Sequence, residues 1–324
     1  MMSVKRVVFV LCAVALNAYA DIWKDVRTGL EWTYEVSDGG AKLVVGENGS
    51  CVNPKPNGSL VIPNFIDELP LTVIGYLAFS ECSGLTEVGI PPNVKVIEDR
   101  AFWVCCDEYD GKIYVYGGCA SLKSVRFADG SNLKSIGSLA FSGCPIEDLA
   151  LPPGLESIGE FAFEYCAQLR TVAFPDSIAR ICECAFDACK LLREVVLPKA
   201  LTEISGHTFY RCSSLSKLTV SGQVTKIGFN AFGECTSLAD VMLSDSITEI
   251  GTFAFSGCCA LRQVVLPAAL QSVSAGAFSH CSSLENIRLP RHVQSIGNSA
   301  FSDCIGLSSV VLHSELAEVG WGGL

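Results

Sequence analysis

Cysteine and histidine are the residues of this chain whose types could support catalysis. A nucleophilic cysteine needs a base within hydrogen-bond reach, and these two residue types are adjacent in sequence at His280 and Cys281. Sequence neighbours point in different directions, so we do not expect this pair to act together. The sequence also lacks a glycine-rich phosphate loop, a nucleophile elbow and a paired-histidine metal motif. We therefore predict that the protein is not an enzyme and uses no cofactor.

Cys182, Cys184 and Cys189 form the group of thiols that most resembles a zinc site. A structural zinc ion needs four ligands that converge on one point. In the repeated unit of this chain, Cys182 stands where other copies have a turn glycine, and Cys189 stands at a core position. We expect these side chains to diverge and predict no metal site.

A 23-residue unit repeats along the chain and must position all of these side chains. From Phe163 to Phe301 a Phe-x-x-Cys motif recurs at intervals of 23 residues, whereas the interval from Phe102 to Phe141 is 39, which indicates an insertion at about 106–118. A unit this short cannot bury its apolar face alone, so neighbouring units must stack into a solenoid. The ten core phenylalanines are Phe79, Phe102, Phe141, Phe163, Phe186, Phe209, Phe232, Phe255, Phe278 and Phe301.

Two segments of the unit, C-x-x-L-x-x-V-x-L-P-x-x-L-x-x-I-G-x-x-A-F-x-x, predict its local structure. The V-x-L segment alternates with a period of two and predicts a short parallel strand. The I-G-x-x-A-F-x-x-C segment has near-helical spacing and predicts a tight helical or 3₁₀ return. We therefore expect an α/β solenoid, a right-handed superhelix with short strands on one face and helical turns on the other.

The cysteines that follow the core phenylalanines should form one buried row. Coils stacked about 4.8 Å apart hold Cβ atoms farther apart than the about 3.8 Å of a disulfide, so we predict a ladder of free thiols. A disulfide from Cys106 to Cys119 or Cys105 is an alternative at the base of the insertion. The cysteines of the mature chain outside the predicted ladder are Cys51, Cys106, Cys119, Cys182, Cys184 and Cys259.

The repeat resembles that of the BspA-like leucine-rich-repeat family of secreted and cell-surface proteins. The likeness extends from Trp32 to Val319, and residues 32–36, 60–63 and 69–75 are similar to the family's N-terminal entry, a strand pair that caps the first coil. The resemblance implies a leucine-rich-repeat solenoid. It also implies a role in adhesion or in host or matrix binding, carried by variable surface residues.

The first 20 residues predict export. Lys5 and Arg6 precede an apolar run at 7–16 and then the A-x-A sequence at 18–20, the three parts of a secretory signal peptide that would be cleaved before Asp21. The apolar run is shorter than the roughly 20 residues that cross a bilayer, and no later stretch is long enough. The mature chain would carry 21 basic and 34 acidic residues, a net charge of −13. This excess disfavours nucleic acid as a partner.

An outward-facing row of strand residues is the first candidate binding site. Stacking turns the residue between V and L of each unit into a continuous row of mostly small or apolar side chains. Apolar rows with polar borders are typical of protein interfaces, although strand propensity alone could also have filled these positions. We call this row the apolar strip: Gly89, Arg126, Ala150, Ala173, Val196, Thr219, Met242, Val265, Arg288 and Val311, with the section from Arg126 to Arg288 as the candidate site.

The insertion and the C-terminal end are two further candidates. Tyr109, Tyr114 and Tyr116 give the insertion amphipathic side chains suited to recognition, but this segment could equally be a hairpin that lengthens the sheet. At the other end, no polar cap is visible after Val319. Either Trp321 folds over the last coil, or the gene product is truncated, or the end pairs with another copy.

The predicted organisation is a signal peptide at 1–20, an N-terminal cap region at 21–57, a solenoid at 58–319 and a short end without a clear cap at 320–324. We expect a secreted or cell-surface binding or adhesion protein that recognises a protein or glycan. The alternatives are a structural or self-associating surface protein and, less favoured by the sequence, an enzyme or inhibitor that acts through the insertion.

Overall fold

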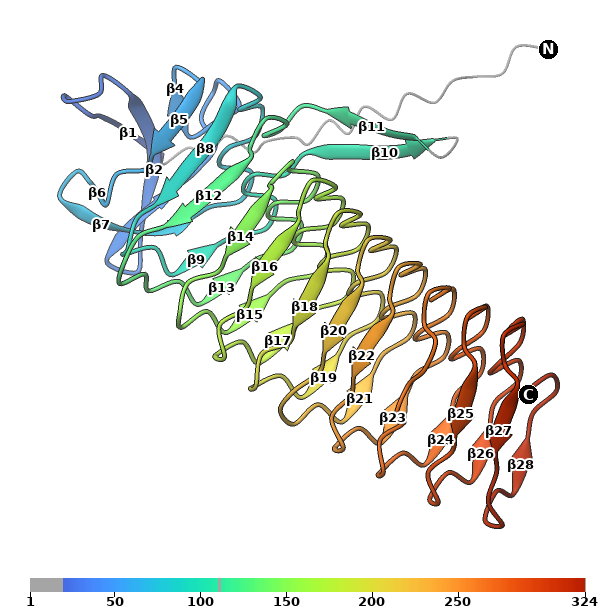
Figure 1. Cartoon of the computed structure of the whole chain (residues 1–324). Helices are drawn as coiled ribbons and strands as arrows, with labels where there is room; N and C mark the ends of the chain where they lie inside the picture. Colours follow the sequence, from blue (N-terminus) through green and yellow to red (C-terminus); the bar gives the residue numbers. More distant parts are fainter. Residues whose placement is uncertain (1–19, 110–111, 324) are drawn as a thin grey trace, which may run out of the picture.

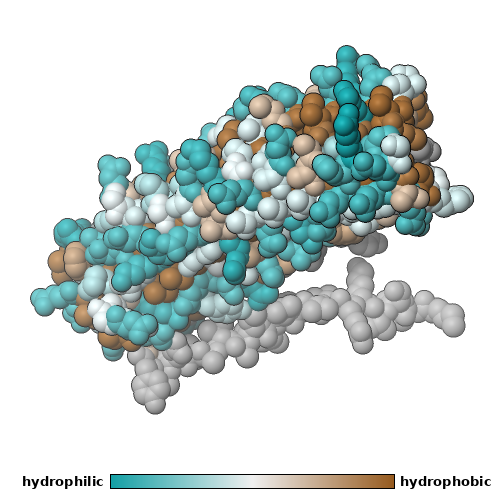
Figure 2. All heavy atoms as spheres, turned by 90° about the horizontal axis from the view of Figure 1, so that it is seen from below, coloured by the Kyte–Doolittle hydropathy of each residue, from teal (hydrophilic) through white to brown (hydrophobic). Residues whose placement is uncertain are grey.

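The computed structural model describes residues 20–109 and 112–323. The predicted signal peptide lies outside these ranges except for Ala20. In the described ranges the chain winds into stacked coils of strands and turns that form an elongated solenoid (Figure 1 and Figure 2). A complete coil contributes one strand to a first strand row and one to a second strand row, and its third side is made of turns.

The first strand row contains the predicted V-x-L strands, except in the unit of Val264, where Gln263 forms only an isolated bridge with Asn286. These strands pair in parallel and in register; Val195, for example, lies opposite Leu218, which lies opposite Val241. Because alternate residues of a strand face opposite sides, the V and L side chains enter the core. The strands are β5 (Gly58–Val61), β8 (Leu85–Ile90), β12 (Ser124–Phe127), β14 (Asp148–Ala150), β16 (Thr171–Ala173), β18 (Glu194–Val196), β20 (Lys217–Thr219), β22 (Asp240–Met242), β25 (Asn286–Arg288) and β27 (Ser309–Val311).

A second row of short parallel strands was not predicted. It contains the isoleucine of the repeated unit, replaced by valine at Val273 and Val319, and its residues pair in register, as Ile204 does with Ile227. The strands are β7 (Leu69–Ile74), β9 (Val96–Ile97), β13 (Ser135–Ile136), β15 (Ser157–Ile158), β17 (Arg180–Ile181), β19 (Glu203–Ile204), β21 (Lys226–Ile227), β23 (Glu249–Ile250), β24 (Ser272–Val273), β26 (Ser295–Ile296) and β28 (Glu318–Val319).

The helical return that the spacing predicted is wrong: the described residues contain no helix, and the solenoid is a β-solenoid. The residue two positions before each core phenylalanine from Phe79 to Phe301 has a left-handed backbone, with φ between 52° and 61°. A left-handed residue cannot continue a right-handed helix. The backbone N–H groups instead donate to the next coil, as the Phe163 N–H does to the Ala185 carbonyl at 2.8 Å. The return therefore consists of turns joined between coils.

The core phenylalanines form a continuous stack along the turn side. Consecutive ring centroids from Phe79 to Phe301 lie 4.6 to 5.6 Å apart with nearly parallel planes. Burying one phenylalanine contributes about 1.5–3 kcal/mol relative to exposure. The predicted Phe spine of the core is confirmed.

A ladder of buried free thiols runs beside this stack. After Cys82, whose thiol lies beside the Ser50 hydroxyl, the ladder thiols donate to the carbonyl oxygen of the phenylalanine one coil earlier, as Cys166 does to Phe141 at 3.3 Å. Burial raises the pKa of the thiols of Cys189 and Cys235 well above its ordinary value. Buried neutral thiols behave as small hydrophobic side chains, as the spacing predicted.

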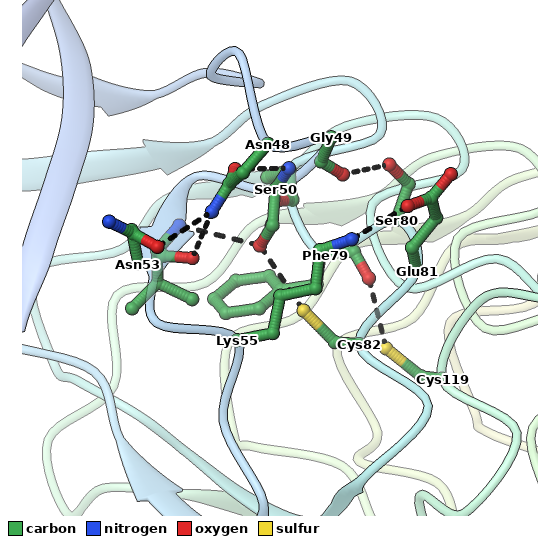
Figure 3. A network of polar contacts seen from close by, with 12 residues as sticks. Asn48, Gly49, Ser50, Asn53, Lys55, Phe79, Ser80, Glu81, Cys82 and Cys119 are labelled. Carbon is green, nitrogen blue, oxygen red and sulfur yellow. Dashed lines mark hydrogen bonds and ion pairs between the residues drawn. The ribbon is translucent and has the colours of Figure 1, made fainter.

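One rung of the ladder differs from the prediction. Cys119, not Cys105, holds the ladder position of the second coil, and its thiol donates to the Phe79 carbonyl at 3.2 Å (Figure 3). Cys105 instead begins strand β10 (Cys105–Tyr109) of the insertion. Both cysteines are free thiols, so the alternative disulfide from Cys106 to either of them is wrong. Cys106 lies among the residues whose side chains the structure does not describe.

The N-terminal region extends the second strand row. β1 (Asp21–Lys24), β2 (Glu31–Ser37) and β3 (Gly40–Leu43) pair antiparallel, and β3 then pairs parallel with β7. β4 (Val52–Asn53) pairs with β2, and β6 (Phe65–Ile66) pairs with β7. The segments on both sides of β4 are bound to the first coil: before it, the Ser50 hydroxyl lies 3.2 Å from the Cys82 thiol, and after it, Lys55 forms an ion pair with Glu81 at 2.6 Å (Figure 3).

Candidate functional site

The apolar strip lies on the outer face of the first strand row. Parallel pairing sets its members side by side: Val196 of β18 is opposite Thr219 of β20, and Thr219 is opposite Met242 of β22. The same register joins Ala150 to Ala173. The strip arises because each coil contributes one residue at the same strand position.

The middle and distal parts of the strip expose large apolar side chains to solvent. Val196, Met242 and Val265 are 51%, 58% and 83% exposed, and Val311 is 51% exposed. Thr219 between them is half-buried. Water in contact with these side chains would be released when a partner covers them, which favours association.

A polar row borders the strip, and several of its charges are paired with one another. Lys217 lies 3.0 Å from Glu194 on the neighbouring strand, and the Thr171 hydroxyl donates to Asp148. Arg126, which the sequence placed at one end of the candidate strip, forms an ion pair with Glu87 at 3.2 Å. Exposed pairs of this kind contribute little to stability, but they reduce the unbalanced charge beside the apolar residues.

A groove of about 590 Å³ continues the strip at the N-terminal end of the solenoid. The β1–β2 turn forms one wall, where the Asp25 carboxylate accepts hydrogen bonds from the Arg27 N–H and the Thr28 hydroxyl, each at 2.9 Å. These hydrogen bonds hold the pKa of Asp25 below its ordinary value. The other lining residues are Val61, Ile62, Pro63, Asn64, Gly89, Ile90, Pro91, Pro92, Arg126, Phe127 and Ala128.

The sequence analysis missed this groove because its wall comes from outside the repeat. Val61 lies opposite Gly89 and Gly89 opposite Arg126, so Val61 continues the strip by one coil and is 77% exposed. The signal for Val61 was available in Leu60-Val-Ile62-Pro63, which matches the end of a strand and its proline. The position of the β1–β2 turn over these prolines had no comparable signal.

The insertion is an antiparallel hairpin of β10 and β11 (Lys112–Tyr116). It forms a two-stranded sheet of its own, so the alternative that it lengthens the main sheet is wrong. Its backbone pairs Tyr114 with Asp107 and Tyr116 with Cys105. The side chains of Tyr109, Tyr114 and Tyr116 lie outside the described residues. The hairpin projects from the turn side (Figure 1), and the apolar strip runs along the first strand row.

The last coil leaves core positions open at the C-terminal end. Leu307, Val310 and Leu316 are only partly buried. Leu284, which occupies the position of Leu307 in the preceding coil, is fully buried. Trp321 is 86% exposed, so the alternative that it folds over the last coil is wrong. Figure 2 shows hydrophobic residues gathered at this end of the molecule, on the right of the view.

His207 is the centre of a second group of side chains, on the turn side. Its ring meets Tyr210 and Phe229 edge-on, with centroid distances of 5.3 and 5.0 Å, and its Nδ1 lies 3.4 Å from the Glu183 carboxylate. Cys184 belongs to the same group. The sequence analysis missed this group, although Cys184 and His207 are separated by 23 residues, one repeat, which was the available signal.

No helix of the described residues is long and apolar enough to span a bilayer.

A family model described as the BspA type leucine rich repeat region matches the chain in six copies, over residues 59–108, 112–227 and 202–321. None of the proteins with curated functions matches the sequence.

Several solved bacterial structures share the fold. A leucine-rich-repeat protein from T. pallidum has a TM-score of 0.55 and 27% identity, with 69% of this chain and 97% of that chain covered. The pneumococcal vaccine antigen PcpA has a TM-score of 0.58 and 20% identity, with 94% and 86% covered. A leucine-rich-repeat protein from Bacteroides ovatus has a TM-score of 0.52 and 23% identity, with 90% of each chain covered.

Proposed function

Because this chain belongs to the BspA type leucine-rich-repeat family, we propose that it is a secreted or cell-surface adhesion protein that binds a protein ligand through the apolar strip. Proteins of this repeat family are typically binding proteins without catalytic activity. The predicted signal peptide supports export. The excess of acidic residues disfavours nucleic acid as the ligand.

The single observation that carries this proposal is the alignment of exposed apolar side chains along the first strand row. Val196 on β18 and Met242 on β22 are more than half exposed, and so is Val265 at the same repeat position of the next coil, where Gln263 forms an isolated bridge with Asn286. A monomer gains nothing from large apolar side chains in water, and a contiguous row of them is a typical interface feature. A protein ligand fits this surface better than a glycan, because the row contains no aromatic platform and few hydrogen-bonding groups.

The groove at the N-terminal end gives the same surface a place for one larger side chain of the ligand. Its apolar floor of Ile90, Pro91 and Phe127 lies beside the charged side chains of Arg27 and Arg126. A concave apolar site with a few polar groups at its edge is the usual form of a recognition pocket. The ligand would therefore extend from the groove along the strip.

Hydrogen–deuterium exchange tests the position of the interface. Binding partners are first identified by surface plasmon resonance on panels of purified extracellular-matrix proteins and of glycans. Exchange is then compared with and without the partner. We expect protection in β18, β20 and β22 and in the segments that line the groove. Protection confined to the turn side or to the hairpin would contradict the proposal, and binding to glycans alone would contradict the choice of a protein ligand.

Self-association is the second candidate, favoured by the exposed apolar end of the solenoid. Ile305 and Trp321 are each 86% exposed, and a second copy that covers this end would bury both. Light scattering at several concentrations should then give a mass that rises with concentration, and Trp321→Asp should abolish the rise. A constant monomer mass at all concentrations would contradict this candidate while leaving the adhesion proposal intact.

A further inference from the structure

Three side chains with metal-binding atoms meet on the turn side of the solenoid. One donor atom each of Glu183, Cys184 and His207 lies within 4.8 Å of the other two. Cys184 and His207 both stand two residues before the core phenylalanine of their coil. Both have a left-handed backbone, with φ of 56° and 54°. The repeat therefore stacks the histidine on the cysteine, and the same turn geometry sets the direction of both side chains.

One of the three separations matches a tetrahedral zinc site, and the other two are at most 4.8 Å. Metal–ligand bonds of about 2.0–2.3 Å place donor atoms roughly 3.3–3.8 Å apart. The Nδ1 of His207 lies 3.4 Å from the Oε1 of Glu183, which already falls in that range. The side chain of Glu183 is 57% exposed, so it can turn towards the thiol without displacing core residues.

The imidazole of His207 is held in place before any metal binds. Tyr210 and Phe229 contact its ring edge-on, and its Nε2 lies 3.4 Å from the side-chain nitrogen of Asn230. If the Asn230 amide rotates by half a turn, its oxygen accepts a hydrogen bond from Nε2–H, and Nδ1 is left with its lone pair for a metal. Metal-bound histidines usually have an outer hydrogen-bond partner of this kind.

The electrostatic surroundings favour a cation over an isolated thiolate. Burial, followed by the negative charges of Asp187, Glu183, Glu164 and Glu160, raises the pKa of Cys184 to about 12. The same negative charges lower the energy of a divalent cation at this position.

We propose that Glu183, Cys184 and His207 bind one Zn²⁺ ion, with the fourth coordination position open to solvent. A thiolate, an imidazole and a carboxylate suit zinc, whereas Ca²⁺ and Mg²⁺ take oxygen ligands. The side chain of His207 is 25% exposed, so the ion would be reached from the surface. This position lies in the turn segment of the coil, away from the apolar strip, and the site is independent of the proposed adhesion.

Binding is a proton exchange in which no electrons are transferred to or from an oxidant. The S–H bond of Cys184 breaks, its electron pair forms the Zn–S bond, and the proton leaves to solvent. Because binding releases this proton, the apparent affinity should rise with pH.

Cobalt(II) titration of the purified, reduced chain tests the proposal. A thiolate bound to Co²⁺ gives a charge-transfer absorption band in the near ultraviolet, and a four-coordinate ion gives intense visible bands. We expect one equivalent of Co²⁺ to produce both, one equivalent of Zn²⁺ to remove them, and the affinity to rise with pH. Cys184→Ser should abolish the thiolate band, and His207→Gln should weaken binding at least tenfold. Circular dichroism of each variant checks that the fold is retained.

Two other thiols provide matched controls. Cys182 is partly exposed two residues away, and Cys259 is exposed on a distant coil, so Cys182→Ser and Cys259→Ser should leave the spectra and the affinity unchanged. The proposal is overturned if wild-type protein shows no thiolate band. It is equally overturned if the band survives Cys184→Ser, or if a control substitution removes it.

Discussion

The thiol of Cys119 lies 3.2 Å from the carbonyl oxygen of Phe79, one coil away. This contact shows that the chain leaves the stack after the core Phe102, forms the β10–β11 hairpin and returns at Cys119 to complete the same coil. Cys119-Ala-Ser-Leu122 then follows the C-x-x-L pattern of the other units. The insertion is therefore placed between two residues of one coil and leaves the stack of coils continuous.

The first prediction concerns this rung of the thiol ladder. Cys119→Ala should lower the free energy of unfolding by about 1–2 kcal/mol, because it removes a buried sulfur and leaves a small cavity. Cys105→Ala should lower it by less than about 0.5 kcal/mol, because Cys105 is only partly buried at the hairpin base. Urea denaturation of both variants measures the difference. A larger loss of unfolding free energy for Cys105→Ala would indicate that Cys105, and not Cys119, occupies the ladder position.

The phenylalanine stack gives the second prediction. Phe209 lies 5.5 Å from the rings of both Phe186 and Phe232, so Phe209→Ala should cost about 3–5 kcal/mol. Phe229→Ala is the matched control, because Phe229 is 46% exposed, and it should cost far less. Equal losses in denaturant titrations would show that the stack is not the main source of stability.

The third prediction is a pH dependence that arises from Glu164. Burial, and then the neighbouring charge of Asp187, raise the pKa of Glu164 from 4.5 to about 7, although a hydrogen bond with Ser142 and the charge of Arg211 act in the opposite direction. The folded chain thus holds this proton more tightly than the unfolded chain. Its stabilising contribution is complete below pH 4.5 and is lost as the pH rises through about 7.

Glu164→Gln removes this titration. The variant should therefore gain stability relative to wild type as the pH rises from 4.5 to 8, measured as the melting temperature at each pH. Carbon-13 NMR of the Glu164 carboxyl would measure the pKa directly. Parallel pH profiles for the two proteins would show that this carboxyl titrates normally.

The fourth prediction separates the two candidate recognition elements. Deleting residues 105–118 joins Val104 to Cys119 and restores Phe-x-x-Cys at Phe102. Because the hairpin forms its own sheet, the shortened chain should keep its cooperative unfolding. It should also bind the ligand within about threefold of wild type. Loss of binding with the fold intact would instead assign recognition to the hairpin that carries Tyr109, Tyr114 and Tyr116.

The sequence predicted the contacts between residues that occupy the same position in neighbouring repeats. The 23-residue period placed Phe209 on Phe186 and Val196 beside Thr219, because identical positions of stacked units become neighbours. It could not decide the form of the return. The spacing of isoleucine, alanine and phenylalanine fits one turn of helix or a strand followed by turns, and hydrogen bonds between coils favour the latter.

The sequence analysis missed two kinds of feature: those that require a comparison of residues in two repeats, and those formed by residues outside the repeats. The pairing of Cys184 with His207 required comparing residues one period apart, and the groove depends on how the β1–β2 turn folds back over Pro91 and Pro92. Neither the direction of that turn nor the depth of the groove follows from local pattern.

The dissociation constant of a strip variant tests the central claim most directly. Val196→Asp combined with Met242→Asp places two charges on the apolar strip, where neither side chain supports the core. The control, Thr225→Asp combined with Gln271→Asp, adds the same charge at two exposed positions. Each of them immediately precedes a strand of the second strand row, β21 or β24. We expect the strip variant to bind the ligand identified by surface plasmon resonance at least a hundredfold more weakly, with an unchanged melting temperature, and the control to bind like wild type. Unaltered binding by the strip variant would contradict the assignment of recognition to this face.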